Sequence, residues 1–189
     1  RLHKITVLHL LQHTAGWDRD KSGDPMFDST AIAKRVGAPA PASPDTIIRY
    51  MMGKPLDFAP GTKEVYSNFG YCVLGRIIEQ VSGKPYEQYV KEAVLAPMGI
   101  TRMRLGKSLR SGKVRDEVTY YQPNLGAAQS VFPTGEKEVP WCYGGFCLES
   151  MDSHGGWLAS AVDLARFCAK LDAPDSPILN SELNQAMYA

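Results

Sequence analysis

The sequence lacks a charge imbalance and a long apolar run, and each absence argues against one class of function. Its 21 basic and 20 acidic residues leave a net charge of +1. Nucleic-acid-binding domains usually carry a basic surface, so nucleic acid is not an expected partner. No apolar stretch approaches the roughly 20 residues that a membrane-spanning helix needs, so we expect no membrane span in this segment. The chain begins without Met or a signal peptide, which predicts an excised or processed segment.

Cysteine is scarce, with four residues in 189. Their spacing does not match a four-ligand zinc site, and we expect neither a metal nor an organic cofactor. Cys142 and Cys147 enclose a flexible Tyr-Gly-Gly-Phe segment, which is compatible with a local disulfide or with two free thiols. Cys72 and Cys168 lie in helical patterns, where cysteine usually serves as a small buried apolar group.

Helical periodicity is the main structural signal that the sequence does contain. The strongest apolar pattern runs from 68 to 82 and ends at Gly83. Ser43 and Ser160 are typical N-terminal caps, each directly before a shorter helical pattern. We therefore predict helices from Thr6 to near Gly16, over 44–52, 68–82, 85–96 and 160–171, and from about residue 180. The stretches 16–42 and 105–156 are predicted to be mostly irregular, with a few short strands between 103 and 139.

Tyr66 and Asn68 are the strongest candidates for a functional pair. They follow a Pro-Gly turn, and residues two apart in an extended segment point to the same side. Both side chains are therefore expected to face one cleft, with Ser67 turned away. A phenol beside a carboxamide suits proton transfer in acyl-transfer chemistry, although a separate nucleophile is required. The plainer alternative is a turn in which Asn68 caps the next helix.

Five segments, in this order, resemble the serine β-lactamase and penicillin-binding-protein-like hydrolases. The resemblance is to the branch that holds class C β-lactamases, D-alanyl-D-alanine carboxypeptidases and esterases. It covers most of the chain, and the joint order is more specific than any one segment. The segments are ITVLHLLQHTAG at 5–16, FAPGTKEVYSNFGY at 58–71, LGRIIE with VSG at 74–83, LAPMGI at 95–100 and GGWLASAVDLARF at 155–167.

The resemblance implies an α/β serine β-lactamase/transpeptidase-like fold. Residues 1–189 would be its mostly α fragment, a helical region with long loops, with the central antiparallel sheet mostly absent. They would form one domain, truncated at both ends.

The same resemblance implies roles for individual residues. The family's active site combines Ser-x-x-Lys, Tyr-x-Asn and a late Lys/His-Thr/Ser-Gly motif. Tyr66 would be the catalytic proton-transfer residue and Asn68 the catalytic orienting residue. His154, Gly155 and Gly156 are candidate substrate-binding residues, although a glycine-rich surface loop explains them as well.

The Ser-x-x-Lys motif is missing from this chain, and the late motif is missing from the part that follows the segment at 155–167. None of its thirteen serines is followed by lysine three residues later, and neither Lys-Thr-Gly nor His-Thr-Gly occurs. The family places these motifs before the segment matched by 5–16 and after the segment matched by 155–167. We therefore expect the chain to be the middle of a larger protein and to be inactive alone.

The parent protein implied by the resemblance is a serine hydrolase. It would act on an amide or ester, such as a β-lactam, a D-Ala-D-Ala peptide or a simple ester, through an acyl-enzyme. Its partner would be a small-molecule or peptide substrate, and its location periplasmic or extracytoplasmic. Two alternatives are a non-catalytic penicillin-binding-like module and a stand-alone helical interaction module.

Two other patterns have simpler explanations. His9 and His13 are four residues apart, a spacing that can bind zinc, but Leu10 replaces the Glu of His-Glu-x-x-His. No metal site is therefore predicted there. The three tryptophans lie in or beside the long loops and fit either a substrate pocket or ordinary packing.

Overall fold

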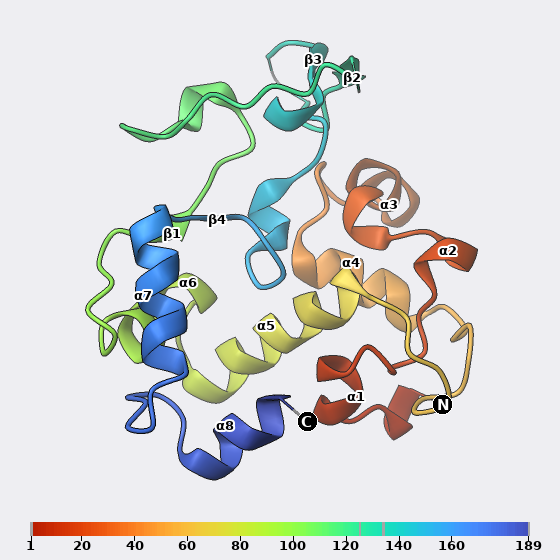
Figure 1. The fold of residues 1–189 in the computed structure, drawn as a ribbon. Helices are drawn as coiled ribbons and strands as arrows, with labels where there is room; N and C mark the ends of the chain where they lie inside the picture. The colour runs from red at the N-terminus through yellow and green to blue at the C-terminus, as the bar shows by residue number, and fades with distance from the viewer. Residues whose placement is uncertain (1, 125, 134, 189) are drawn as a thin grey trace. The chain divides into compact units, whose positions relative to one another are not determined.

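The computed structural model describes residues 2–124, 126–133 and 135–188 (Figure 1). Its chain divides into two compact units, one comprising the chain up to Ile77 with Gly106–Gly156 and the other Ile78–Leu105 with the chain from Trp157 onwards. The α-helices are α1 (Val7–Leu11), α2 (Arg19–Ser22), α3 (Ser29–Val36), α4 (Pro44–Met52), α5 (Asn68–Ser82), α6 (Tyr86–Val90), α7 (Ala161–Leu171) and α8 (Ser181–Tyr188). The strands are β1 (Arg104–Leu105), β2 (Ala127–Gln129), β3 (Glu138–Pro140) and β4 (Trp157–Leu158).

Short 3₁₀ and π segments complete the regular structure. The 3₁₀ turns are η1 (Leu2–Lys4), η2 (Pro25–Phe27), η4 (Arg110–Gly112), η5 (Trp141–Tyr143) and η6 (Leu148–Met151). The π-helical segment η3 (Lys91–Leu95) directly continues α6. None of the described helices is long and apolar enough to cross a membrane.

Capping residues fix most of the helix starts that the sequence predicts. Ser43 accepts from the amide of Thr46 at the start of α4, and Ser160 accepts from that of Asp163 at the start of α7. Such caps satisfy backbone donors that the helix itself leaves open. The predicted helices over 44–52, 68–82 and 160–171, and the one near 180, are confirmed. The helix after Thr6 is shorter than predicted, because it ends at Leu11 rather than near Gly16.

The prediction that 16–42 is irregular is wrong. This stretch contains α2, η2 and α3: α2 and η2 are too short to produce a clear apolar period, and α3 begins without a side-chain cap hydrogen bond. Two aspartates cap the first two of these elements. Asp18 accepts from the amide of Asp20 at the start of α2, and Asp24 accepts from that of Met26 at the start of η2. The folded stretch brings Asp24 to a fixed position beside α5.

Two small antiparallel sheets make up the strand content of the described residues. In the first unit β2 pairs with β3, with Ala128 opposite Val139. In the second unit β1 pairs with β4, with Leu105 opposite Trp157. The described residues are therefore mostly helical, with only two small antiparallel sheets, as the resemblance implies.

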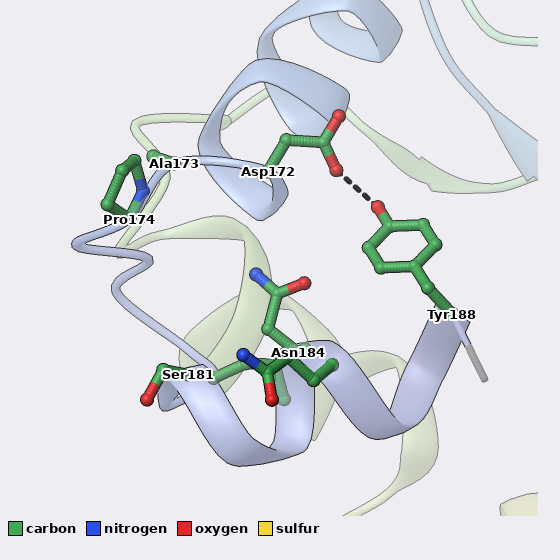
Figure 2. Close-up of a pocket in the computed structure, with 8 residues that line it drawn as sticks. Asp172, Ala173, Pro174, Ser181, Asn184 and Tyr188 are labelled. Carbon is green, nitrogen blue, oxygen red and sulfur yellow. Dashed lines mark hydrogen bonds between the residues drawn. The ribbon is translucent and has the colours of Figure 1, made fainter.

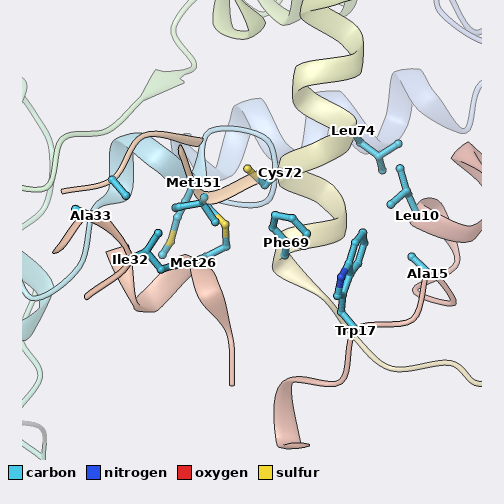
Figure 3. Close-up of a cluster of buried hydrophobic side chains, with 12 residues drawn as sticks. Leu10, Ala15, Trp17, Met26, Ile32, Ala33, Phe69, Cys72, Leu74 and Met151 are labelled. Carbon is cyan, nitrogen blue, oxygen red and sulfur yellow. The ribbon is translucent and has the colours of Figure 1, made fainter. Parts of the chain in front are cut away.

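The core of the first unit surrounds the first half of α5 (Figure 3). Phe69 and Cys72 are fully buried there, and Trp17 packs edge-on against Phe69 with ring centroids 4.6 Å apart. Burying aromatic and aliphatic side chains in this way contributes about 1.5–3 kcal/mol per residue. Trp17 is therefore a core residue, which favours packing over the substrate-pocket alternative. The other buried members are Leu10, Ala15, Met26, Ile32, Ala33, Ala42, Ile47, Leu74 and Met151.

The second unit has a smaller core of its own. Leu95, Met98 and Ile100 are buried, and partly buried side chains from α7 and β4 pack against them. Large apolar side chains are exposed on helices of both units. Leu8 is 58% exposed on α1, Val162 is 65% exposed on α7 and Leu183 is 55% exposed on α8.

Candidate active site

The segment that carries Tyr66 is held against the residues that follow α1. Gly61 turns the chain with a φ of 80°, which glycine adopts without strain. Its amide donates to the carbonyl of Thr14 at 2.9 Å, and the amide of Val65 donates to that of His13 at 2.9 Å. These hydrogen bonds fix the backbone on the N-terminal side of Tyr66.

Tyr66 and Asn68 point toward each other, as the i, i+2 spacing predicts. The Tyr66 hydroxyl donates to Asn68 Oδ1 at 2.9 Å. Asn68 Nδ2 donates in turn to Asp24 Oδ2 at 2.7 Å. Phenol, carboxamide and carboxylate thus form one chain of hydrogen bonds, while the Tyr66 side of it stays open to solvent, since Tyr66 is 51% exposed.

Ser67 is turned away from this chain and is buried. Its hydroxyl accepts from the amide of Gly70 at 3.1 Å, which is the hydrogen bond of an N-terminal cap. Ser67, rather than Asn68, therefore caps α5. This arrangement leaves the Asn68 carboxamide available to Tyr66 and Asp24.

His13 contacts the same segment through a hydrogen bond and through its ring. Its Nδ1 accepts from the amide of Ser67 at 3.1 Å, so this nitrogen carries no proton. Its ring lies between Tyr66 and Tyr71, with centroids 4.8 and 5.0 Å away. Burial lowers the pKa of His13, and the opposing effect of the Glu64 carboxylate is smaller. The neutral imidazole that results is the form that this hydrogen bond requires.

A cation contacts the ring of Tyr66, and the residue before that cation is part of an ion pair. The Arg19 guanidinium lies over the Tyr66 ring, 5.5 Å from its centroid. Lys63 pairs with Asp18 at 2.7 Å, and this hydrogen bond is the main reason that the pKa of Asp18 lies below its usual range. A cation near an aromatic face is attracted to it electrostatically, so Arg19 and His13 both contact the phenol ring.

His154, Gly155 and Gly156 form a glycine-rich turn after η6. Both ring nitrogens of His154 are buried, with no hydrogen-bond partner among the described residues. Burial lowers the pKa of His154, and the Asp24 and Asp152 carboxylates only partly oppose this shift. Gly156 has a φ of 73° and accepts from the amide of Gly106 at 2.7 Å. The Asp24 carboxylate therefore lies close enough to act on His154, and the substrate-binding role of His154, Gly155 and Gly156 stays a prediction.

The remaining sequence candidates have structural roles. His9 completes a capping box with Thr6 at the start of α1. All four cysteines are free, so the disulfide alternative for Cys142 and Cys147 is wrong. Cys72 is buried as predicted, whereas Cys168 is exposed because it lies on the outer face of α7. Within the described part of the chain, no group of His, Cys, Asp or Glu could hold a metal ion.

A separate hollow in the second unit is unrelated to these candidates (Figure 2). It lies between the end of α7 and α8, where the Tyr188 hydroxyl donates to Asp172. Its lining residues are Asp172, Ala173, Pro174, Leu179, Ser181, Asn184, Gln185 and Tyr188, and they include no histidine, lysine or cysteine to activate a nucleophile.

Solved structures define the class to which this fold belongs. The chain is 28% identical to the octameric penicillin-binding protein homologue from Pyrococcus abyssi, with a TM-score of 0.62 over 96% of this chain and 37% of that one. The D-amino acid amidase from Ochrobactrum anthropi SV3, at 20% identity and a TM-score of 0.60, shares the fold over 96% of this chain and 46% of that one. The class is a penicillin-binding-protein-like fold.

The chain belongs to the beta-lactamase family, whose family model matches residues 1–188. A relative from Escherichia coli O157:H7, named "Putative D-alanyl-D-alanine carboxypeptidase", is 25% identical over 173 residues. That alignment covers 85% of this chain and 37% of the relative. The chain thus spans little more than a third of the length of this curated relative.

Asp24 and His13 are the residues of this site whose roles the sequence did not reveal. Asp24 precedes a proline, which is a recognisable N-terminal cap signal, but nothing local connects it to Asn68. His13 lies within the segment 5–16 that carries the family resemblance, and nothing local connects it to Tyr66.

Proposed function

We propose that the longer protein containing this chain is a serine hydrolase that cleaves an amide or ester through an acyl-enzyme. The observation that carries the proposal is the hydrogen bond between Tyr66 and Asn68, in a chain of the beta-lactamase family. Relatives named as a carboxypeptidase and an amidase support an amide substrate. D-Ala-D-Ala peptides, β-lactams and simple esters are the candidate substrates.

The proposed mechanism divides the chemistry between this chain and residues outside it. A serine of a Ser-x-x-Lys motif outside residues 1–189 attacks the carbonyl carbon, forming a C–O bond. Tyr66 Oη relays the serine proton to the leaving amine or alcohol as its bond to the acyl carbon breaks. Water then releases the acyl group. Asn68 orients the substrate amide, and the turn at His154 to Gly156 lines the substrate.

Substitution of Tyr66 tests this proposal in the longer protein. Tyr66→Phe keeps the ring that contacts His13 and Arg19 but removes the hydroxyl, so kcat/KM should fall by about 10²–10⁴. Tyr121→Phe removes the same group from a residue that is 81% exposed and should stay within about twofold of wild type. A Tyr66→Phe enzyme as active as wild type would exclude a role for the phenol in proton transfer.

A further inference from the structure

Asp24 contacts Asn68 through a carboxylate whose two oxygens both have defined partners. Oδ2 accepts from Asn68 Nδ2 at 2.7 Å, and Oδ1 accepts from the backbone amide of Met26 at 3.0 Å. The second bond belongs to the start of η2 and fixes the direction of the carboxylate. Asp24 therefore meets Asn68 from the N-cap position of η2, with its carboxylate held by a backbone amide.

This contact determines which way the Asn68 carboxamide points. An ionised carboxylate only accepts hydrogen bonds, whereas a carboxamide has a donor end and an acceptor end. Turning the amide around would place its carbonyl oxygen against the Asp24 oxygen and leave two acceptors facing each other. The donor end must therefore face Asp24, and Oδ1 must face Tyr66.

The amide direction in turn determines the direction of the Tyr66 proton. With Oδ1 facing it at 2.9 Å, the Tyr66 hydroxyl must donate to Asn68. Its oxygen lone pairs are then left to accept a hydrogen bond from the serine hydroxyl, and the Tyr66 proton held by Asn68 passes to the leaving group as the serine proton arrives. A reversed amide would present N–H groups to Tyr66 and occupy those lone pairs instead.

We infer that Asp24 is a positioning residue, which holds the Asn68 carboxamide in the one orientation that directs the Tyr66 proton toward Asn68. Its effect on the reaction rests on the function proposed above, while its effect on the Asn68 amide does not. Asp24 acts through Asn68 and does not itself contact the reacting atoms.

A double-mutant cycle in the longer protein tests this inference. Asp24→Asn keeps a good N-terminal cap for η2 but presents either a donor or an acceptor to Asn68. We expect kcat to fall about tenfold with little change in KM, because a charge-assisted hydrogen bond is replaced by a weaker neutral one. In an Asn68→Ala background, the same substitution should have no further effect. The control is Asp20→Asn, which makes the same charge change at an exposed position and should stay within about twofold of wild type.

Two kinetic outcomes would overturn the inference. One is an Asp24→Asn enzyme with wild-type kcat. The other is an equal loss with and without Asn68, because this would show that Asp24 acts independently of Asn68.

A second measurement is independent of catalysis. The longer protein is labelled with ¹⁵N-asparagine, and the Asn68 side-chain resonance is assigned from its loss in Asn68→Ala. Its amide protons should exchange with solvent at least about tenfold more slowly than those of exposed Asn124, and Asp24→Asn should remove most of this protection. Equal exchange for Asn68 and Asn124 in the wild type would refute the contact. Protection that depends on Asp24 in a protein without hydrolase activity would leave this inference standing and refute the proposed function.

Discussion

At the scale of single residues, the site combines a predictable pair with two partners that only the fold supplies. Tyr66 and Asn68 are two residues apart, so local geometry alone predicts that they face the same side. Asp24 lies 44 residues from Asn68, and His13 lies 54 residues from Ser67. Side chains this far apart in the chain meet only because η2 and the end of α1 both pack against the start of α5.

The lowered pKa values of two histidines predict how the stability of the fold depends on pH. The pKa values of His13 and His154 both lie below the ordinary value of 6.5 in the folded protein, mainly because of burial. As pH falls below about 6.5, the unfolded chain therefore binds protons before the folded one does. Their contribution to stability is complete above this pH and is lost as pH falls through the lowered folded-state values.

His13→Asn tests this dependence. Asparagine tolerates the positive φ of 56° at this position, so the backbone can be retained. The free energy of unfolding, measured in urea from pH 7.5 to 5.5, should fall less steeply in His13→Asn than in wild type. His154 should account for part of the slope that remains. His3→Asn, at an exposed position, should keep the wild-type slope. An unchanged slope in His13→Asn would contradict the assignment of a buried neutral imidazole.

At the scale of elements, the helices that can be predicted from the sequence are those that combine a capping residue with an apolar pattern. α4, α5 and α7 combine a cap with a long apolar pattern, and their bounds agree with the prediction. α2 spans only four residues, and α3 begins after Asp28 without a side-chain cap hydrogen bond, so neither gives a clear sequence signal. Their position therefore depends on packing around Met26 and Ile32, which are fully buried in the first core.

The cap of α5 makes a testable contribution to stability. Ser67→Ala removes the hydroxyl that accepts from the amide of Gly70 and leaves that donor buried without a partner. The free energy of unfolding should fall by about 1–2 kcal/mol. Ser111→Ala, at an exposed position, should change it by less than about 0.5 kcal/mol. Denaturant titration of the wild type and both variants measures these changes. A Ser67→Ala variant as stable as wild type would show that the cap contributes nothing.

At the scale of the whole molecule, the family match and the missing motifs fit one explanation. The family model matches residues 1–188, yet the chain spans only 37% of a curated relative. Large apolar side chains on α1, α7 and α8 are exposed, as expected for helices that pack against further structure. We therefore propose that residues 1–189 are the helical part of a larger hydrolase domain. The motif positions relative to this part came from the family resemblance, because composition and periodicity carry no such information.

The most direct test of the proposed acyl-enzyme is the mass of the intact protein after reaction with a penicillin or a fluorophosphonate. The longer protein should gain the mass of one covalently bound group, because its Ser-x-x-Lys serine would be the nucleophile. The 189-residue chain, which contains no such motif, should gain none under the same conditions. A longer protein that gains no mass from either reagent, or a 189-residue chain that is itself labelled, would contradict the proposal that Tyr66 and Asn68 serve a nucleophile outside this chain.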